Sequence, residues 1–282
     1  YKNPTSRWTA SQANEEVWAP EVTPHLYNQR VRLHKNLVLI GDVKTQPTAS
    51  SPLTGFDAIT HGESAILAHT KLQLKTIPTP QHSLPKILTT TGACTKPNYT
   101  DSKAGALGSF HHTVGAALVE MRGKRFHLRQ LNADRNGAFQ DLSTIYWPGG
   151  ITPGMNIAGL VLGDTHVDSM DPRVHKATFG EGGMTDTLDP AEIVFHDLLD
   201  AYAVNPHHDG NPFNVYAKHI ANRQDAQAEM QRALTYAWVN AGERAVVVPS
   251  NHDDMLRRWI VSKDWKTADP ANMAFYLTTA RM

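Results

Sequence analysis

The chain has 282 residues, with 27 Lys and Arg against 27 Asp and Glu, so its formal net charge is zero. No stretch approaches the ~18 consecutive apolar residues of a membrane helix, and we therefore expect no membrane partner. A single cysteine excludes an internal disulfide and fits a reducing cytoplasm. The length predicts about two domains.

The charges are unevenly distributed along the chain. Residues 1–150 carry 16 Lys and Arg against 10 Asp and Glu, a net charge of +6. Residues 151–282 carry 11 against 17, a net charge of −6. A basic half suits a polyanionic partner and an acidic half suits cation binding, although ordinary scatter of surface charge fits equally well.

Residues 1–147 predict a small, basic α+β domain. The apolar run that ends at Gly41-Asp42 is typical of a buried strand. Val43-Lys44 follows where a histidine ligand would be needed, so we assign this strand end no metal role. Between residues 45 and 85 the chain is rich in Thr, Pro and Ser, which predicts loops around a short helix near Glu63–Leu72.

A strand pair with a glycine turn is predicted from residues 115–121 and 125–131. The turn region holds the densest basic cluster of the chain, which could contact DNA phosphates. The alternative is a solvated hairpin face without a partner. The four residues of this cluster are Arg122, Lys124, Arg125 and Arg129.

Residues 148–156 are rich in Pro and Gly and predict a linker between two domains. The rest, residues 157–282, alternates helical patterns with short apolar runs. The longest helical pattern spans Asn214–Asn240, breaks near Asn222 and stops at Gly242, which resembles a helix C-cap. Repeated helix-then-strand units indicate a layered α/β sheet.

Three apolar runs in this second part each end in polar residues of metal-ligand type. Because ligand sites in open α/β sheets lie beyond the carboxyl ends of the strands, we expect these residues to converge at one sheet edge. Mixed Asp, His and Asn ligands favour Mn²⁺, Fe²⁺ or Zn²⁺ over an all-oxygen Ca²⁺ site. The three segments are Asp164-Thr165-His166, His196-Asp197 with Asp200, and Ser250-Asn251-His252-Asp253.

The order of these segments resembles that of the calcineurin-like metallophosphoesterases, whose motifs run Asp-x-His, Gly-Asp-x-x-Asp and Gly-Asn-His-Asp/Glu. The resemblance implies a layered metallophosphoesterase-type sheet with two divalent metal ions, Mn²⁺ first and Fe²⁺ or Zn²⁺ as alternatives. It implies that Asp164 and His166 bind the first metal and that Asp197 bridges both. Asn251 would bind the second metal, and His252 would act as the acid near the leaving group.

Two positions depart from the family pattern, because His196 and Ser250 stand where the family has Gly. We interpret both as positions of backbone geometry that remove no metal contact. The family completes its site with later histidines, and none follows Asp254. We therefore expect a catalytic domain truncated at its C-terminus, with further ligands beyond Met282, in a piece of a longer polypeptide.

Several of these residues have simpler explanations. Asp253 could orient the His252 imidazole, but Asn251 and Asp253 could also cap a helix. Asp200 could also cap a helix, or hold a metal ligand in place. His207 and His208 could contact metal or substrate phosphate, or lie on a solvated loop.

The basic first part joined to this catalytic half resembles large phage-encoded metallophosphoesterases that degrade DNA. The implied function is phosphodiester hydrolysis by a two-metal-activated hydroxide, with DNA as partner, in the cytoplasm of the infected host. One alternative is a nucleotide or phosphoprotein phosphatase with the same metal site. Another is a non-catalytic binding or assembly module, and a homo-oligomer is left open.

Overall fold

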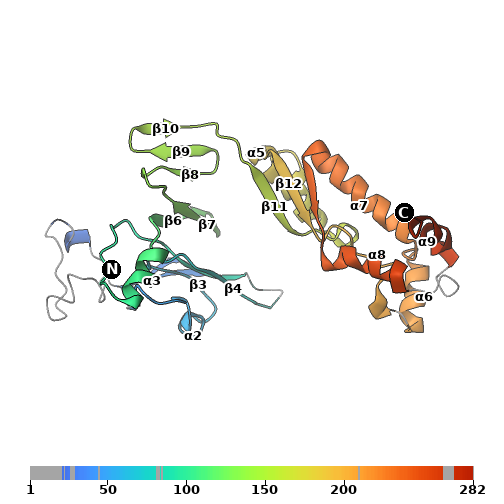
Figure 1. The fold of residues 1–282 in the computed structure, drawn as a ribbon, viewed down its shortest axis with the longest axis horizontal. Coiled ribbons are helices and arrows are strands. Elements are labelled where there is room, and N and C mark those ends of the chain that lie inside the picture. The colour runs from blue at the N-terminus through green and yellow to red at the C-terminus, as the bar shows by residue number, and fades with distance from the viewer. Residues whose placement is uncertain are drawn as a thin grey trace. The chain divides into compact units, whose positions relative to one another are not determined.

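A computed structural model describes residues 21, 23–25, 29–43, 45–80, 83, 85–208, 210–262 and 270–281 (Figure 1). The chain divides into two compact units, Tyr1–Pro153 (unit 1) and Gly154–Met282 (unit 2). The division falls within residues 148–156. No helix in the described part of the chain combines the length and apolarity needed to cross a membrane.

Unit 1 is built on a five-stranded mixed sheet. Its central strands are parallel, and an antiparallel strand lies at each edge. The core holds Leu37, Ile40, Leu67 and Leu88, all almost fully buried. The strand order is β1 (Arg30–His34), β2 (Leu37–Ile40), β3 (Ser64–Leu67), β5 (Lys86–Thr90) and β4 (Leu74–Ile77).

The helix predicted near Glu63–Leu72 is wrong. β3 occupies this stretch as a fully buried strand, and the nearby helix, α2, is Phe56–Ile59. An apolar run of four residues is too short for periodicity to separate a strand from a helix. Pairing with β2 and β5 therefore decides the conformation of Ser64–Leu67.

After the main sheet, the described part of unit 1 holds a helix and two small antiparallel sheets. The predicted hairpin is confirmed, with Gly123 at φ 60° in its turn. A three-stranded meander follows, and its last strand takes three residues of the predicted linker because they pair with β9. These elements are α3 (Lys103–His111), β6 (Gly115–Arg122), β7 (Arg125–Asn132), β8 (Phe139–Asp141), β9 (Thr144–Trp147) and β10 (Gly150–Thr152); η1 (Thr23–His25) precedes the main sheet.

Unit 2 contains a three-stranded parallel sheet in the order β11 (Gly159–Asp164), β12 (Glu192–His196) and β13 (Ala245–Val248). These are the three predicted apolar runs, and the α/β class is confirmed at this level. Metallophosphoesterase layering stays a prediction.

Helices follow each strand of unit 2. The predicted break near Asn222, where φ is 52°, separates α6 from α7. Gly242, at φ 57°, ends α7. Four alanines at spacings of seven and four along α7 are buried, which lets this helix pack closely in the core. The helices are η2 (Val167–Ser169), α4 (Pro172–Phe179), α5 (Met184–Leu188), η3 (Pro206–His208), α6 (Pro212–Ile220), α7 (Ala226–Ala241), η4 (Gly242–Arg244), α8 (Asn251–Ser262), η6 (Pro270–Asn272) and α9 (Met273–Thr279).

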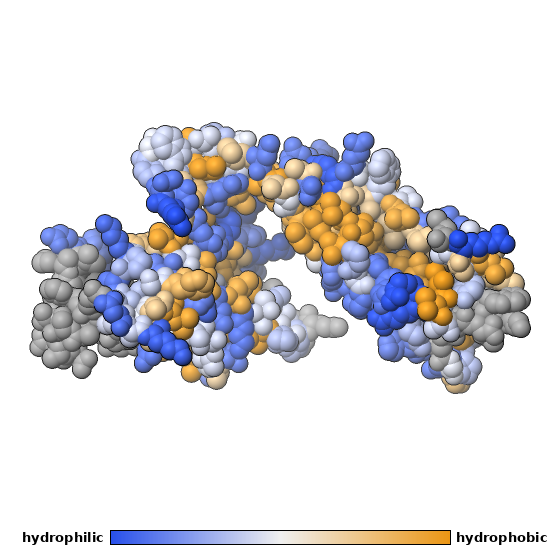
Figure 2. Space-filling view, in the orientation of Figure 1, coloured by the Kyte–Doolittle hydropathy of each residue, from blue (hydrophilic) through white to orange (hydrophobic). Residues whose placement is uncertain are grey.

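Apolar side chains also gather on the surface of unit 2 over the strands of its sheet (Figure 2). Val161 on β11 is 72% exposed, and Val246 and Val248 on β13 are exposed as well. Parallel sheets are usually covered on both faces. Within the described part of unit 2, this valine surface is left uncovered.

Candidate metal centre

The first two predicted segments lie side by side because β11 and β12 are parallel neighbours. Asp164 pairs with His196 in the strand register. The pairing continues past the strand ends, where the amide of Thr165 donates to His196 O at 3.0 Å and that of His166 donates to Asp197 O at 2.8 Å. The backbone therefore fixes where these two loops begin relative to each other.

Both loops bend sharply where they leave the sheet. His166 has φ 40° and Asp197 has φ 44°, which is left-handed backbone that non-glycine residues rarely adopt. Such conformations cost on the order of 1–3 kcal/mol and cluster at functional sites. The strain is held at two residues that the sequence predicts as ligands.

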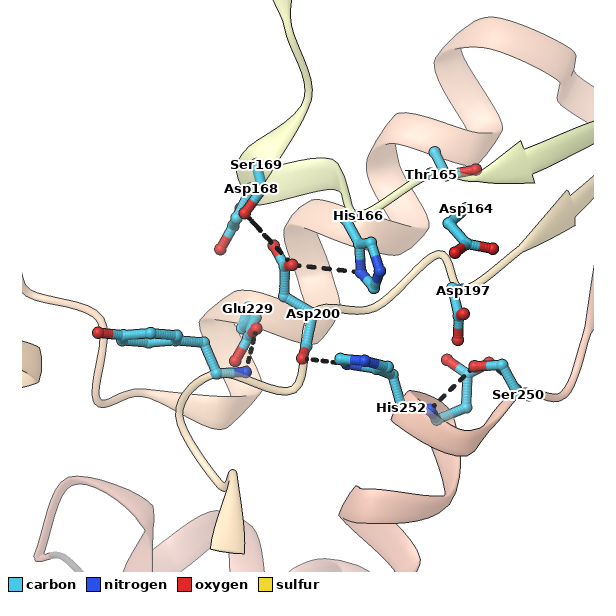
Figure 3. A network of polar contacts seen from close by, with 12 residues as sticks. Asp164, Thr165, His166, Asp168, Ser169, Asp197, Asp200, Glu229, Ser250 and His252 are labelled. Atoms are coloured by element: carbon cyan, nitrogen blue, oxygen red, sulfur yellow. Dashed lines mark hydrogen bonds and ion pairs between the residues drawn. The ribbon is translucent and has the colours of Figure 1, made fainter. Parts of the chain in front are cut away.

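Three predicted ligands converge at this edge of the sheet. Ligand atoms of Asp164, His166 and Asp197 all lie within 4.8 Å of one another (Figure 3). Asn251, the fourth predicted ligand, is the exposed first residue of α8, beside Ser250 and His252. The carboxyl ends of β11 and β12 thus supply one cluster, as the sequence predicts.

Two buried atoms of this cluster lack hydrogen-bond partners among the described residues. They are Asp197 Oδ1 and His166 Nδ1, and Asp197 is only 5% exposed. A buried polar atom without a partner costs about 1–3 kcal/mol, and more when it is charged. A divalent cation bound by Asp197 would remove much of that cost, so the residues present fit a metal site.

Asp197 is held in its charged form. Burial alone would raise the pKa of this carboxyl, but the nearby side chain of Ser250 and the imidazoles of His196, His252 and His166 outweigh it. The net effect is a pKa below the usual range for Asp. Metal ligation requires the carboxylate, and the surroundings of Asp197 favour that form at neutral pH.

His196 also belongs to the cluster, although the family pattern suggests only a position of backbone geometry there. Its Nδ1 lies 3.0 Å from Asp164 Oδ1 and 3.6 Å from Asp197 Oδ2. The signal that could have found it is its place as the last residue of β12, directly opposite the end of the parallel β11. His196 thus contacts both carboxylates that are proposed as metal ligands.

His252 is oriented by Asp200 and not by Asp253. Its Nδ1 lies 2.8 Å from the backbone oxygen of Asp200, and its ring packs edge-on against His166, with centroids 4.6 Å apart (Figure 3). A carbonyl oxygen only accepts, so Nδ1 carries the proton in this bond. In the neutral ring, Nε2 is then unprotonated, and it is the nitrogen that can take up and release a proton.

The predicted catalytic role of Asp253 in orienting the imidazole is therefore wrong. The Asp253 carboxylate accepts from the amide and hydroxyl of Ser250, at 3.0 and 2.9 Å, and its own amide donates to Ser250 Oγ. These reciprocal bonds form a capping box at the start of α8. Helix capping, the simpler alternative, explains Asp253.

Asp200 connects several parts of the site. Its Oδ1 lies 3.3 Å from His166 Nδ1, within ion-pair distance but without hydrogen-bond geometry, and Ser169 Oγ donates to the same carboxylate (Figure 3). Arg223 Nη2 lies 3.6 Å from Asp200 Oδ2, and its guanidinium stacks on the Tyr202 ring at 4.2 Å. Asp200 thus faces one predicted ligand with its side chain and holds His252 with its backbone.

A second acidic group adjoins this residue. Ligand atoms of Asp168, Asp200 and Glu229 lie within 4.8 Å of one another. Arg232 holds the pKa of Asp168 below its usual range through a two-point contact, whereas burial raises the pKa of Glu229. Because arginines contact Asp168 and Asp200, and two backbone amides donate to Glu229, we interpret this group as a network of ion pairs and hydrogen bonds.

The histidines of the following loop are not members of either group. His207 and His208 form part of η3, where His207 is exposed and His208 stacks edge-on against Tyr202 at 4.9 Å. Neither belongs to a metal-type cluster among the described residues. Their role in contacting metal or phosphate stays a prediction.

The predicted DNA-contacting cluster of unit 1 separates into two parts. Arg122, Lys124 and Arg125 are exposed around the hairpin turn. Arg129 is instead bound to Asp141 by two bonds, of 2.6 and 3.1 Å, and to Glu120 at 2.9 Å. Two carboxylates already neutralise Arg129, so its predicted phosphate contact is not supported and its role is to join the hairpin to β8.

Comparison with known proteins gives one informative match. Protein A1 of Escherichia phage T5 is 28% identical over 267 residues, which cover 89% of this chain and 48% of that protein. This chain is related to a phage protein. It spans about half the length of that relative. No protein-family model and no solved structure matches the chain.

Proposed function

We propose that unit 2 catalyses metal-dependent hydrolysis of phosphodiesters and that the substrate is DNA. The observation that carries the proposal is the buried Asp197 Oδ1, which has no hydrogen-bond partner among the described residues and lies beside Asp164 and His166. The relationship to a phage protein is consistent with an enzyme that acts during infection.

The donor set fits two divalent ions, with Mn²⁺ the first expectation. Asp164 and His166 would hold one ion, Asn251 would hold the other, and Asp197 would contact both. The chemistry that such ions supply is to hold the attacking water and to neutralise the phosphoryl oxygens. Asn251 adds a neutral oxygen, so it supplies a ligand without repelling the anionic substrate.

His252 would act on the leaving group. Its Nδ1–H is bound to Asp200 O, so the proton given to the departing oxygen would come from Nε2 of the doubly protonated ring, which would then become the neutral Nδ1–H form. Proton transfer by a positioned side chain contributes about 10²–10⁴ to rate. Asp200 serves this step by fixing the ring and its tautomer.

DNA is favoured over a small phosphate ester by the hairpin of unit 1. Its turn exposes Arg122, Lys124 and Arg125, and the first 150 residues carry a net charge of +6. Clustered cations attract the regularly spaced phosphates of a polynucleotide and make its binding salt-dependent. A phosphatase acting on one small ester needs no such surface.

The test combines metal binding with two substrates. Calorimetry should show saturable Mn²⁺ binding to the purified chain, and Mn²⁺ should activate cleavage of both plasmid DNA and a small aryl phosphodiester. Efficient turnover of phosphomonoesters without DNA cleavage would instead favour a phosphatase. Absence of Mn²⁺, Fe²⁺ and Zn²⁺ binding would overturn the proposal.

A further inference from the structure

One face of α7 contacts both loops that carry the predicted ligands. Glu229, Arg232 and Tyr236 lie at spacings of three and four residues, and therefore on one side of the helix. Each reaches a segment that follows β11 or β12. None of the three belongs to the cluster of Asp164, His166 and Asp197.

Glu229 holds the loop after β12. Its side chain is 4% exposed, and its two oxygens accept from the amides of Tyr202 at 2.8 Å and Ala203 at 2.9 Å. Ala201, immediately before these amides, has φ 52°. The buried carboxylate thus stabilises a strained turn that begins at Asp200, the residue that contacts both site histidines.

Arg232 holds the loop after β11. Its Nε and Nη2 donate to the two oxygens of Asp168 at 2.9 and 2.6 Å. Asp168 lies two residues beyond His166, in η2. A two-point contact between planar groups fixes orientation as well as distance. One turn further along α7, the Tyr236 hydroxyl donates to Met170 Sδ at 2.8 Å and lies 2.9 Å from His175 Nδ1, which tethers α4 after the same loop.

We propose that Glu229 and Arg232 are positioning residues for the metal centre. They set the separation of the two loops, and through it the placement of His166 and His252. The inference rests on the proposed function for its metal-binding consequence, but the placement of the two imidazoles can be measured without metal. Helix α7 is packed in the core through its buried alanines, so it can act as a reference for loops that contain left-handed residues.

The decisive variants are Glu229→Gln and Arg232→Lys. A glutamine has the same shape but only one acceptor oxygen, so its NH₂ group would face one of the two loop amides. Lysine keeps the charge of Arg232 but loses the planar two-point contact. The matched control is Arg244→Lys, which breaks an Arg–Asp189 pair of 3.1 Å in the same unit, at a distance from these loops along the chain.

Nitrogen-15 NMR of the metal-free protein reports the protonation and hydrogen bonding of the imidazole nitrogens directly. Glu229→Gln should change the Nδ1–H signature of His252, and Arg232→Lys should shift the nitrogens of His166, whereas Arg244→Lys should change neither. A purely structural role would lower the unfolding midpoint and leave the signatures of the folded protein unchanged. Wild-type signatures for both histidines in both variants would overturn the inference.

Calorimetric Mn²⁺ titration gives the second readout. Removing a group that holds a metal ligand in place typically weakens metal affinity about 10–100-fold. We expect that weakening in both variants and not in the control. If the wild-type chain binds no divalent metal, the proposed function fails, while the NMR result still decides the positioning inference.

Discussion

Each unit of this protein has a sheet with parallel neighbouring strands in which one strand leads into Gly-Asp, and only one of the two strand ends forms a candidate site. β2 is followed by Gly41-Asp42. Asp42 forms an ion pair with Arg30 of the neighbouring β1, with 3.3 Å between Oδ1 and Nε. β11 ends at Gly163-Asp164, and Asp164 faces His196 of the neighbouring β12 at 3.0 Å. The acidic residue is the same, so the neighbouring strand decides what it can do.

Histidines near the strand ends show the same contrast. His69 follows β3 and is 3% exposed; its Nε2 lies 3.0 Å from Gln46 O, and its Nδ1 accepts from the Lys71 amide at 3.0 Å. Both ring nitrogens are satisfied. His166 follows β11, and its buried Nδ1 has no hydrogen-bond partner among the described residues. Between these two histidines, the unsatisfied buried nitrogen, and not residue type, separates the candidate ligand from the structural residue.

The largest expected effect separates Asp197 from Asp42. Asp197→Ala should abolish Mn²⁺ binding and DNA cleavage, because it removes the one carboxylate proposed to contact both ions. Asp42→Ala should leave both unchanged and cost about 0–1 kcal/mol of stability, as expected for an exposed ion pair. Calorimetry and a cleavage assay measure the two variants side by side. Cleavage that survives in Asp197→Ala would remove the basis for the comparison.

The second effect separates binding from chemistry within the site. His252→Ala should keep Mn²⁺ affinity and slow hydrolysis by about 10²–10⁴, because the proton donor is removed while the proposed ligands stay. The decrease should be greatest for substrates with poor leaving groups. His127→Ala, on the exposed side of β7, is the control. If His252→Ala releases metal as completely as Asp197→Ala, then His252 is a ligand and not the acid.

The sequence predicts this protein best where the structure is periodic or where a special residue is required. The apolar runs of unit 2 form its three strands, and Gly123 and Gly242 mark a turn and a helix end. The prediction of a helix near Glu63–Leu72 was wrong, because so short an apolar run carries no period and pairing of Ser64–Leu67 with β2 and β5 decides. Local pattern therefore predicts elements, and long-range pairing decides ambiguous ones.

The same limit applies to the candidate site. Asp164, His166 and Asp197 could be predicted because each follows an apolar run, and ligands collect at the carboxyl ends of parallel strands. Hydrogen-bond partners could not be predicted. Asp253 bonds to Ser250, and Arg129 bonds to Asp141, so neither is available for the role that its residue type suggested. Residue type and position along the chain suggest a function for a side chain. The hydrogen bonds in the structure show whether that side chain is already engaged elsewhere.

A third prediction sharpens the contrast between free and neutralised cations in unit 1. Replacing Arg122, Lys124 and Arg125 with Ala should flatten the slope of log K for DNA against log salt. The change should be about 0.9 for each duplex phosphate that these side chains neutralise in the wild-type protein. Cleavage of a small phosphodiester should hardly change. Fluorescence anisotropy across a salt series measures the slope.

Arg129→Ala is the internal control for that experiment. Because its guanidinium is already bound to Asp141 and Glu120, it should leave the salt slope unchanged and lower the stability of the hairpin instead. An unchanged slope in the triple variant would mean that the turn is only a solvated face. The case for DNA would then lack its structural support.

The smallest expected effect concerns pH and His69 in unit 1. Burial lowers the pKa of this imidazole below its ordinary value, against the opposing hydrogen bond that its Nε2–H donates to Gln46 O. The neutral ring fits both bonds, since protonating Nδ1 would place an N–H against the Lys71 amide. Below a pH of about 6.5 the unfolded chain therefore binds a proton that the folded chain resists. Stability should fall as pH decreases from there, by at most about 1.4 kcal/mol per pH unit, until the folded-state pKa is reached.

Hydrogen exchange of the β2, β3 and β5 amides between pH 7 and pH 5, corrected for intrinsic rates, measures this decrease. His69→Gln is the matched variant, because a glutamine can donate to Gln46 O and accept from the Lys71 amide without titrating in this range. Its core amides should lose less protection than those of the wild type as pH falls. Equal decreases in the two proteins would show that His69 is not the group responsible. A buried histidine with both nitrogens bound would then contribute to packing alone, and the contrast with His166 would rest on its unsatisfied Nδ1.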